Sequence, residues 1–207
     1  LSDFIMIIIG VDEAGRGPLV GSVVAAAVAF PANFQIDGLT DSKKLSEKKR
    51  EELYAQITTK CYWASAESNS IEIDEINIVQ ATMIAMKRAV NVLQHQLMSQ
   101  TQAQDFKVLV DGNRCPDVEN CEAIIKGDLI EPVISAASII AKVTRDRQMK
   151  ELDKIYPEYG FSRHKGYGSQ HHIESIKTHF ATPIHRQSFN PILDYLPTLK
   201  YYKDNRL

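Results

Sequence analysis

The hydrophobic pattern of the chain predicts five β-strands. The first is a continuous apolar run near the start of the sequence, which is typical of a central strand covered on both faces. The later strands are shorter and are separated by turn-forming Pro, Gly and Asp residues. The predicted strands span residues 5–11, 21–30, 61–66, 107–110 and 123–125.

Helical periodicity predicts further elements between and after these strands. A charged helix is expected after Asp41, with Leu53, Tyr54 and Ile57 as its inner face. In the longest pattern, apolar side chains recur at spacings of three and four. An irregular basic loop is expected over residues 161–168. The other predicted helices span residues 74–100, 134–152 and 171–180.

This order of elements predicts an α/β fold with a sheet of mixed direction. The first two strands are joined by a short turn, whereas the later strands alternate with helices. No repeat or long linker divides the sequence, so we expect a single domain over residues 5–195. Its core would cover about 5–152 and a C-terminal helical extension about 153–195, followed by a tail, 196–207.

The composition is that of a globular protein: 207 residues, 44% hydrophobic and 24% charged. The first ten residues have no basic leader and are too few to span a membrane, so neither a signal peptide nor membrane association is expected. The three cysteines, Cys61, Cys115 and Cys121, lack CxxC spacing, which favours reduced thiols in a cytoplasmic protein. A metal-binding pair of Cys115 and Cys121 stays open as an alternative.

The charge is unevenly distributed along the sequence. The net charge is -2, which is not that of a protein that coats nucleic acid without specificity. Residues 142–207 contain 12 Lys and Arg against 7 Asp and Glu, whereas the remainder is acidic. The C-terminal third is therefore expected to face a phosphate backbone. Five histidines of this region are interpreted as surface or backbone-bonding residues rather than metal ligands: His164, His171, His172, His179 and His185.

Acidic residues follow three of the predicted strands. Asp12 and Glu13 come after the first strand, Asp111 after the fourth and Asp128 after the fifth. Side chains at neighbouring strand ends converge at one sheet edge, and carboxylates suit hard divalent cations. The alternative for each residue is a turn or cap. Strict alternation sends Asp12 and Glu13 to opposite faces, so the strand must bend there or Glu13 must act through its carbonyl or from the turn.

A glycine-flanked arginine, Gly15-Arg16-Gly17, follows these acids directly. The glycines allow a ligand to approach the backbone closely, and the guanidinium suits a planar grip on phosphate. Two divalent ions about 3.5–4 Å apart would neutralise the attacking and leaving oxygens of a phosphodiester. Together these features indicate metal-assisted chemistry on a phosphate-bearing substrate.

At this level of detail the sequence resembles the ribonuclease HII family, the type 2 ribonucleases H. The resemblance covers about residues 8–191, in family order. The matching motifs are Asp12-Glu13-Ala14-Gly15-Arg16-Gly17-Pro18, Asp41-Ser42-Lys43-Lys44-Leu45, Val110-Asp111-Gly112-Asn113, Lys126-Gly127-Asp128, the run from Ser135 to Asp146, His164-Lys165-Gly166-Tyr167-Gly168 and His185-Arg186-Gln187-Ser188-Phe189.

The resemblance implies a ribonuclease H-like mixed β-sheet flanked by helices, with the helical extension at the C-terminus. It implies hydrolysis of RNA in RNA–DNA hybrids and incision 5′ of single ribonucleotides in duplex DNA, leaving 3′-hydroxyl and 5′-phosphate ends, as in DNA replication and repair. Asp12, Glu13 and Asp111 match metal-binding positions and Asp128 the fourth catalytic carboxylate. The cofactors would be two Mg²⁺ or Mn²⁺ ions, and a monomer is expected.

The resemblance also implies substrate-binding residues. Gly15, Arg16 and Gly17 match the loop that senses the ribose 2′-hydroxyl, the local group that separates RNA from DNA. Tyr167 matches the tyrosine that packs against the following deoxyribose; the alternative is a half-buried loop tyrosine. Four cations are candidates for backbone contacts, or else solvated charges: Lys43, Lys44, Lys142 and Arg145.

Other classes of protein fit less well. A noncatalytic nucleic-acid binder would bind hybrids without metal and release no product. A resolvase or phosphatase on a similar sheet would act without any ribonucleotide. A nucleoside triphosphate enzyme is disfavoured because the sequence has no G-x-x-x-x-G-K-[ST] loop. Ribonuclease HIII normally carries an N-terminal substrate-binding domain, for which the sequence leaves no room before residue 5.

Overall fold

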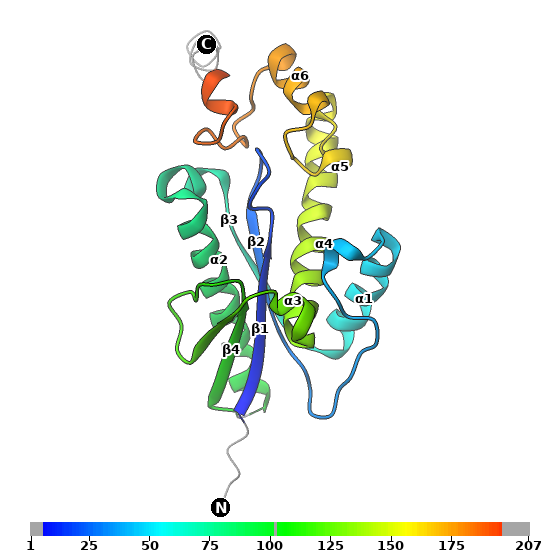
Figure 1. The fold of residues 1–207 in the computed structure, drawn as a ribbon, viewed down its shortest axis with the longest axis vertical. Helices are drawn as coiled ribbons and strands as arrows, with labels where there is room; N and C mark the ends of the chain where they lie inside the picture. The colour runs from blue at the N-terminus through cyan, green and yellow to red at the C-terminus, as the bar shows by residue number, and fades with distance from the viewer. Residues whose placement is uncertain (1–5, 102, 196–207) are drawn as a thin grey trace, which may run out of the picture. The chain divides into compact units, whose positions relative to one another are not determined.

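The structure, a computed structural model, describes residues 6–101 and 103–195. Its centre is a five-stranded sheet in the order β3-β2-β1-β4-β5 (Figure 1). β1 pairs with β2 in antiparallel and with β4 in parallel direction, and β5 extends the parallel side. The predicted mixed sheet is therefore confirmed. The strands are β1 (Met6–Ala14), β2 (Val23–Ala29), β3 (Tyr62–Ser68), β4 (Asp105–Asp111) and β5 (Cys121–Ile124).

The helices confirm the predicted order and add short elements to it. The predicted irregular loop at 161–168 begins with a helical turn, and the longest helix begins before residue 74 and contains a kink at Asn77. None of the described helices is long and apolar enough to cross a membrane. The α-helices are α1 (Glu47–Lys60), α2 (Ser70–Thr101), α3 (Gly127–Ile130), α4 (Pro132–Ile155), α5 (Phe161–His164) and α6 (Gln170–His179), and the 3₁₀ helices are η1 (Ser42–Lys44) and η2 (Pro157–Tyr159).

The chain forms two compact units, each built from separate segments. Among the described residues, the sheet unit contains 6–14, 24–67, 82–101 and 103–144, and the C-terminal unit contains 15–23, 68–81 and 145–195. The chain therefore passes from one unit to the other within α2 and within α4.

The core of the sheet unit lies between the sheet and helices α1 and α4. Figure 1 shows these helices on one side of the sheet and α2 on the other. The Ser/Ala-rich start of α4 packs closely on β1, because Gly10 leaves no room for a Cβ: such an atom would lie 2.6 Å from Ile134 N. Ala136, Ala137 and Ala141 of α4 are fully buried in this core. Small residues on both elements thus bring the helix onto the central strand.

The core of the C-terminal unit is rich in aromatic and histidine side chains. Tyr159 and Phe161 are buried and stack with their rings 5.2 Å apart. His172 and His185 are also buried and bond to the backbone of Tyr167 and Thr182, so they take the backbone-bonding role expected from sequence and not the surface one. Leu19, from the start of the chain, packs into the same core.

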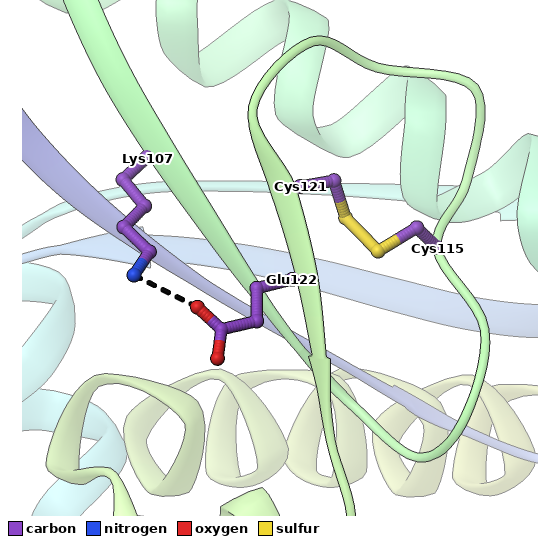
Figure 2. The surroundings of a disulfide bond; sticks show 4 residues. All are labelled: Lys107, Cys115, Cys121 and Glu122. Atoms are coloured by element: carbon purple, nitrogen blue, oxygen red, sulfur yellow. Dashed lines mark ion pairs between the residues drawn. A yellow bond between two sulfur atoms is a disulfide. The ribbon is translucent and has the colours of Figure 1, made fainter.

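Two of the three cysteines form a disulfide. Cys115 and Cys121 are bonded, with their Cα atoms 6.0 Å apart, and only Cys61 is a free cysteine within the part of the chain that the structure describes (Figure 2). The expectation of reduced thiols is therefore wrong for this pair, and so is the alternative of a metal-binding pair. Cys115 lies in the connection after β4, and Cys121 is the first residue of β5. Lys107 of β4 and Glu122 of β5 form an ion pair across the two strands at 2.8 Å. The short connection folds back and brings the two thiols together.

Candidate active site

Three of the predicted acidic residues meet at one end of the sheet. Val11 of β1 pairs with Val110 of β4 in parallel register, so Asp12 and Asp111 occupy the next positions along two neighbouring strands. Asp128 lies at the start of α3, and its N–H donates to Asp111 Oδ1 at 3.3 Å. The structure thus brings Asp12 next to Asp111, which lies 99 positions later in the sequence.

Backbone geometry places Asp128. Lys126, two residues after the end of β5, adopts a left-handed conformation with φ of 58°. Gly127 then passes so close to α4 that a Cβ there would lie 2.6 Å from the Ile134 side chain. Because this turn is tight, α3 begins immediately after the strand, and Asp128 lies beside the end of β4.

Glu13 continues the strand rather than leaving it. The expected strand end at residue 11 is wrong, because β1 runs to Ala14 and Glu13 pairs with Ala25 of β2. Glu13 N–H donates to the Asp12 carboxylate at 2.7 Å. The Glu13 charge raises the pKa of Asp12, so the two side chains interact despite strand alternation.

The acids make one another harder to ionise. Asp12 is only 6% exposed, and its pKa is raised well above the ordinary value by burial, then by the charges of Glu13 and Asp111. The pKa of Asp128 is also raised, by burial first and then by Asp111 and Asp41. Such a cluster of carboxylates favours a bound cation, which would remove their mutual repulsion.

A serine pair supports Asp12 from the helix side. Ser138 of α4 hydrogen-bonds to Asp12 and lowers its pKa in part. Ser138 Oγ also lies 2.9 Å from Ser42 Oγ, and both serines are buried. Sequence reasoning missed these residues as site components, although both lie in the matched motifs. For Ser138 the signal in the sequence was a polar side chain among the apolar residues of α4.

The donor set suits divalent cations, although its present arrangement is not a ready cage. Oxygen donors from Asp12, Glu13, Asp111 and Asp128 are the ligands that hard cations prefer. No group of three or more His, Cys, Asp or Glu side chains in the described ranges 6–101 and 103–195 is placed so that it could hold a metal ion. The electrostatic coupling of the acids nevertheless fits a site that cations complete.

Two lysines lie within electrostatic reach of Asp128. Lys43 and Lys44 follow Asp41 in η1, and both side chains are exposed. Their charges lower the pKa of Asp128, so they lie within electrostatic reach of it. Asp41 accepts a hydrogen bond from Lys43 N at 2.9 Å and caps this turn. Exposed cations next to a carboxylate cluster are suitably placed for an anionic substrate.

The Gly15–Gly17 loop belongs to the C-terminal unit, where the buried Arg186 side chain binds its carbonyl groups. Arg186 is 0% exposed. Its guanidinium donates to the carbonyls of Gly15 at 2.6 Å, Arg16 at 2.9 Å, Pro18 at 2.7 Å and Gly21 at 2.9 Å. Sequence reasoning assigned Arg186 no role, because its partners lie about 170 residues earlier in the chain.

The structure places Tyr167 against this loop. A Cβ on Gly17 would lie 3.3 Å from the Tyr167 ring, so the ring passes directly over the glycine. The Tyr167 side chain is 50% exposed, as is needed for contact with a ligand. Arg16, next to Gly17 in the sequence, is also exposed. The predicted ribose-sensing loop and the predicted sugar-packing tyrosine therefore form one surface.

Arg145 and Lys142 were both predicted to contact phosphates, and the structure places them differently. Arg145 is 2% exposed and donates to Val20 O at 2.8 Å, and a Cβ on Gly15 would collide with its guanidinium. Arg145 therefore supports the loop from inside, and its expected phosphate contact is wrong. Lys142 is half-buried on α4, and its expected contact stays a prediction.

Comparison with known proteins gives the family. The family model described as Ribonuclease HII matches residues 9–192. The ribonuclease HII of Acinetobacter baylyi is 55% identical over 188 residues, 89% of this chain and 95% of the relative. That of Polynucleobacter necessarius is 54% identical over 185 residues, 88% of this chain and 92% of the relative.

A solved structure agrees with these relatives. The crystal structure of the ribonuclease H2 from Pyrococcus horikoshii is 27% identical and superposes with a TM-score of 0.73, covering 94% of this chain and 99% of that one. With a family match that includes the acid cluster and the Gly15–Gly17 loop, the chain belongs to the ribonuclease HII family of metal-dependent endoribonucleases that act on RNA–DNA hybrids.

Proposed function

We propose that this enzyme incises duplex DNA on the 5′ side of a single embedded ribonucleotide, besides hydrolysing RNA in hybrids. The products would carry 3′-hydroxyl and 5′-phosphate ends. The observation that carries the proposal is the meeting of Asp12, Asp111 and Asp128 at one end of the sheet, with the pKa values of Asp12 and Asp128 both raised.

The acids would hold two divalent ions, Mg²⁺ or Mn²⁺. Asp12 would be shared, with Asp111 and Asp128 on one side and Glu13 on the other. When bound, such ions lower the pKa of an attacking water and neutralise the charge on the leaving oxygen. The carboxylates of this chain contribute the negative charge that makes ion binding favourable, and Ser138 orients Asp12 from α4.

The lysines of η1 would contact the substrate backbone. Lys43 and Lys44 are exposed and lie within electrostatic reach of Asp128. A phosphodiester that approaches a carboxylate cluster is repelled by it, and nearby cations reduce that repulsion. These lysines would therefore act on substrate binding more than on the chemical step.

Recognition of the ribonucleotide would fall to the C-terminal unit. Arg186 binds the carbonyl groups of the Gly15–Gly17 loop from inside, which fixes the peptide planes of the loop. A fixed backbone with no side chain at Gly15 and Gly17 can approach a 2′-hydroxyl closely. The Tyr167 ring would pack on the next sugar and reject an additional hydroxyl there.

A labelled duplex that contains one ribonucleotide tests this function. The enzyme is incubated with Mg²⁺, Mn²⁺ or EDTA, and the product ends are mapped. We expect one incision 5′ of the ribonucleotide with either metal and none with EDTA. Cleavage of an all-DNA duplex, or a cut 3′ of the ribonucleotide, would contradict the proposal.

Single carboxamide substitutions test the site. Asp12→Asn and Asp111→Asn remove a negative charge with almost no change in shape, so we expect no detectable cleavage and unchanged duplex binding. Asp105→Asn is the matched control, because Asp105 is exposed at the opposite end of β4. Turnover at the wild-type level by either site variant in saturating Mg²⁺ would exclude the assignment.

A further inference from the structure

Two histidines, the buried His172 and the half-buried His164, bond to the backbone of Tyr167. The Tyr167 carbonyl accepts from Ser169 N at 2.8 Å and bonds with His172 Nδ1 at 2.9 Å, while Tyr167 N–H donates to His164 O at 2.9 Å. The backbone N–H and carbonyl of Tyr167 are therefore both bonded, although the Tyr167 side chain is half exposed. The direction in which the ring leaves the backbone is fixed by these contacts.

His172 is itself held by a second histidine. His172 Nε2 lies 3.1 Å from His185 Nε2, and His185 Nδ1 lies 2.9 Å from Thr182 N. His172 and His185 are 0% and 1% exposed, so water cannot replace these bonds. A chain of three hydrogen bonds thus leads from Thr182 to the carbonyl of Tyr167.

The chain has only one consistent set of protons. The Thr182 amide can only donate, so His185 Nδ1 accepts and His185 carries its proton on Nε2. The Tyr167 carbonyl can only accept, so His172 carries its proton on Nδ1 and accepts at Nε2. Both rings are neutral, and a proton added to His172 would place two N–H groups face to face.

A third histidine, His164, bonds to Gly166, the residue before Tyr167. Gly166 N–H donates to His164 Nδ1 at 3.2 Å, and the His164 ring stacks on His172 with centroids 4.6 Å apart. Gly166 O accepts from Leu19 N at 2.8 Å, which ties the same turn to the Gly15–Gly21 segment. The turn before Tyr167 is therefore bonded to the loop that Tyr167 covers.

We propose that His172, held by His185, is a positioning residue that fixes Tyr167 and so determines the preference for a deoxyribose after the ribonucleotide. The inference rests on the proposed role of Tyr167 in substrate selection. Neither histidine touches the substrate. They act through the Tyr167 carbonyl, because a ring that can tilt away from Gly17 would reject an extra 2′-hydroxyl less strictly.

Two substitutions at His172 separate its two bonds. An Asn amide nitrogen occupies the position of Nδ1, so His172→Asn keeps the bond to the Tyr167 carbonyl and loses the one to His185. A Gln amide reaches the position of Nε2, so His172→Gln keeps the bond to His185 and loses the one to Tyr167. The two variants have the same polarity, and His171→Gln is a matched control on an exposed neighbouring histidine.

The measurement is kcat and KM on two duplexes of one sequence, one with a single ribonucleotide and one a full RNA–DNA hybrid. We divide kcat/KM on the single-ribonucleotide duplex by kcat/KM on the hybrid. For His172→Gln we expect this ratio to fall about fivefold, the equivalent of one hydrogen bond. His172→Asn and His171→Gln should stay within about twofold of the wild-type ratio, because both variants keep a hydrogen bond to the Tyr167 carbonyl and a fivefold loss needs most of that bond. Tyr167→Ala gives the ratio of an enzyme without the ring.

The outcomes distinguish the two proposals. If Tyr167→Ala lowers the ratio but His172→Gln does not, the inference fails and the proposed function stands. If Tyr167→Ala leaves the ratio unchanged, the role of Tyr167 and the inference fail together. A parallel loss on both duplexes in His172→Gln would also overturn the inference, since that is the effect of a purely structural residue.

Nitrogen NMR of the wild-type enzyme is a second test that needs no variant. At pH 7, His172 should be the Nδ1–H tautomer and His185 the Nε2–H tautomer. An Nε2–H tautomer or a protonated ring at His172 would overturn the inference, because either one removes the chain of bonds to Tyr167.

Discussion

At the scale of single residues, the acid cluster weakens the fold that carries it. Asp12 is buried beside two other carboxylates, and its pKa is raised above that of the unfolded chain. An acid of this kind lowers stability at neutral pH, because the unfolded state lets it ionise freely. The charges therefore do not serve stability, which fits the metal-binding role proposed for these acids.

The repulsion between these carboxylates predicts that Asp111→Asn stabilises the metal-free enzyme. The amide removes a charge that raises the pKa of Asp12 and can still accept from Asp128 N–H. We expect the free energy of unfolding at pH 7 in EDTA to rise by about 1 kcal/mol. Urea unfolding measures this change, and a less stable variant would show that Asp111 supports the fold. Added Mn²⁺ should raise the melting temperature of the wild type more than that of the variant.

The two buried histidines predict a loss of stability on acidification. Burial lowers the pKa of His172 to about 4 and that of His185 to about 3, from an ordinary value of 6.5. Because the folded pKa values are depressed, the stabilising contribution is complete above pH 6.5. It is lost as the pH falls towards 4, where only the unfolded chain takes up the protons.

Comparison with His172→Asn isolates this effect. Between pH 7 and pH 5, the wild type should lose about 2 kcal/mol more of its unfolding free energy than the variant, since one titrating ring is missing from the latter. Denaturant unfolding at both pH values measures the difference. Equal losses in the two proteins would mean that His172 is already protonated in the fold, or is exposed.

The residues found from sequence are those whose chemistry is visible locally. Asp12, Asp111 and Asp128 follow apolar strands, so their convergence could be anticipated from strand topology. Arg186 and Ser138 could not be found in this way. Their partners are set by tertiary contacts, and a buried arginine and an exposed one look the same in a sequence.

At the scale of elements, close packing of β1 on α4 positions the site. Gly10 and Asp12 share the strand face that α4 covers, and Ser138 reaches Asp12 from that helix. Element type and order were predictable from periodicity, whereas some boundaries were not. β1 extends past its apolar run because pairing with β2 continues through Glu13, and backbone pairing leaves no hydrophobic signal.

The packing of these elements predicts a large effect of Gly10→Ala. The added Cβ would collide with the backbone of Val133, which cannot rotate away as a side chain could. We expect a loss of about 1–3 kcal/mol in unfolding free energy, together with a drop in kcat because α4 carries Ser138. Urea unfolding and single-turnover cleavage check both effects. An Ala variant of wild-type stability would mean that α4 can shift without cost.

At the scale of the whole molecule, the residues proposed to bind metal and those proposed to recognise the ribonucleotide lie in different units. The acid cluster lies in the sheet unit, whereas the Gly15–Gly17 loop, Tyr167 and Arg186 lie in the C-terminal unit. The chain enters the second unit directly after Ala14, two residues beyond Asp12. Sequence reasoning found the acids, the Gly15–Gly17 loop and Tyr167 but not Arg186, and it expected a single domain because no linker separates these segments.

This division predicts that Arg186→Lys damages recognition while sparing the acid cluster. A lysine carries one compact cation and cannot serve the carbonyls of Gly15, Arg16, Pro18 and Gly21 at once, as the guanidinium does. Because the loop is then free to move, we expect kcat/KM on the single-ribonucleotide duplex to fall about tenfold or more, a loss of about 1.4 kcal/mol. The rise in melting temperature caused by Mn²⁺ should stay at the wild-type value, since it reports on the carboxylates. Arg163→Lys, at an exposed position of the same unit, is the control. A variant that loses its response to Mn²⁺ as well would show that the two units do not act independently.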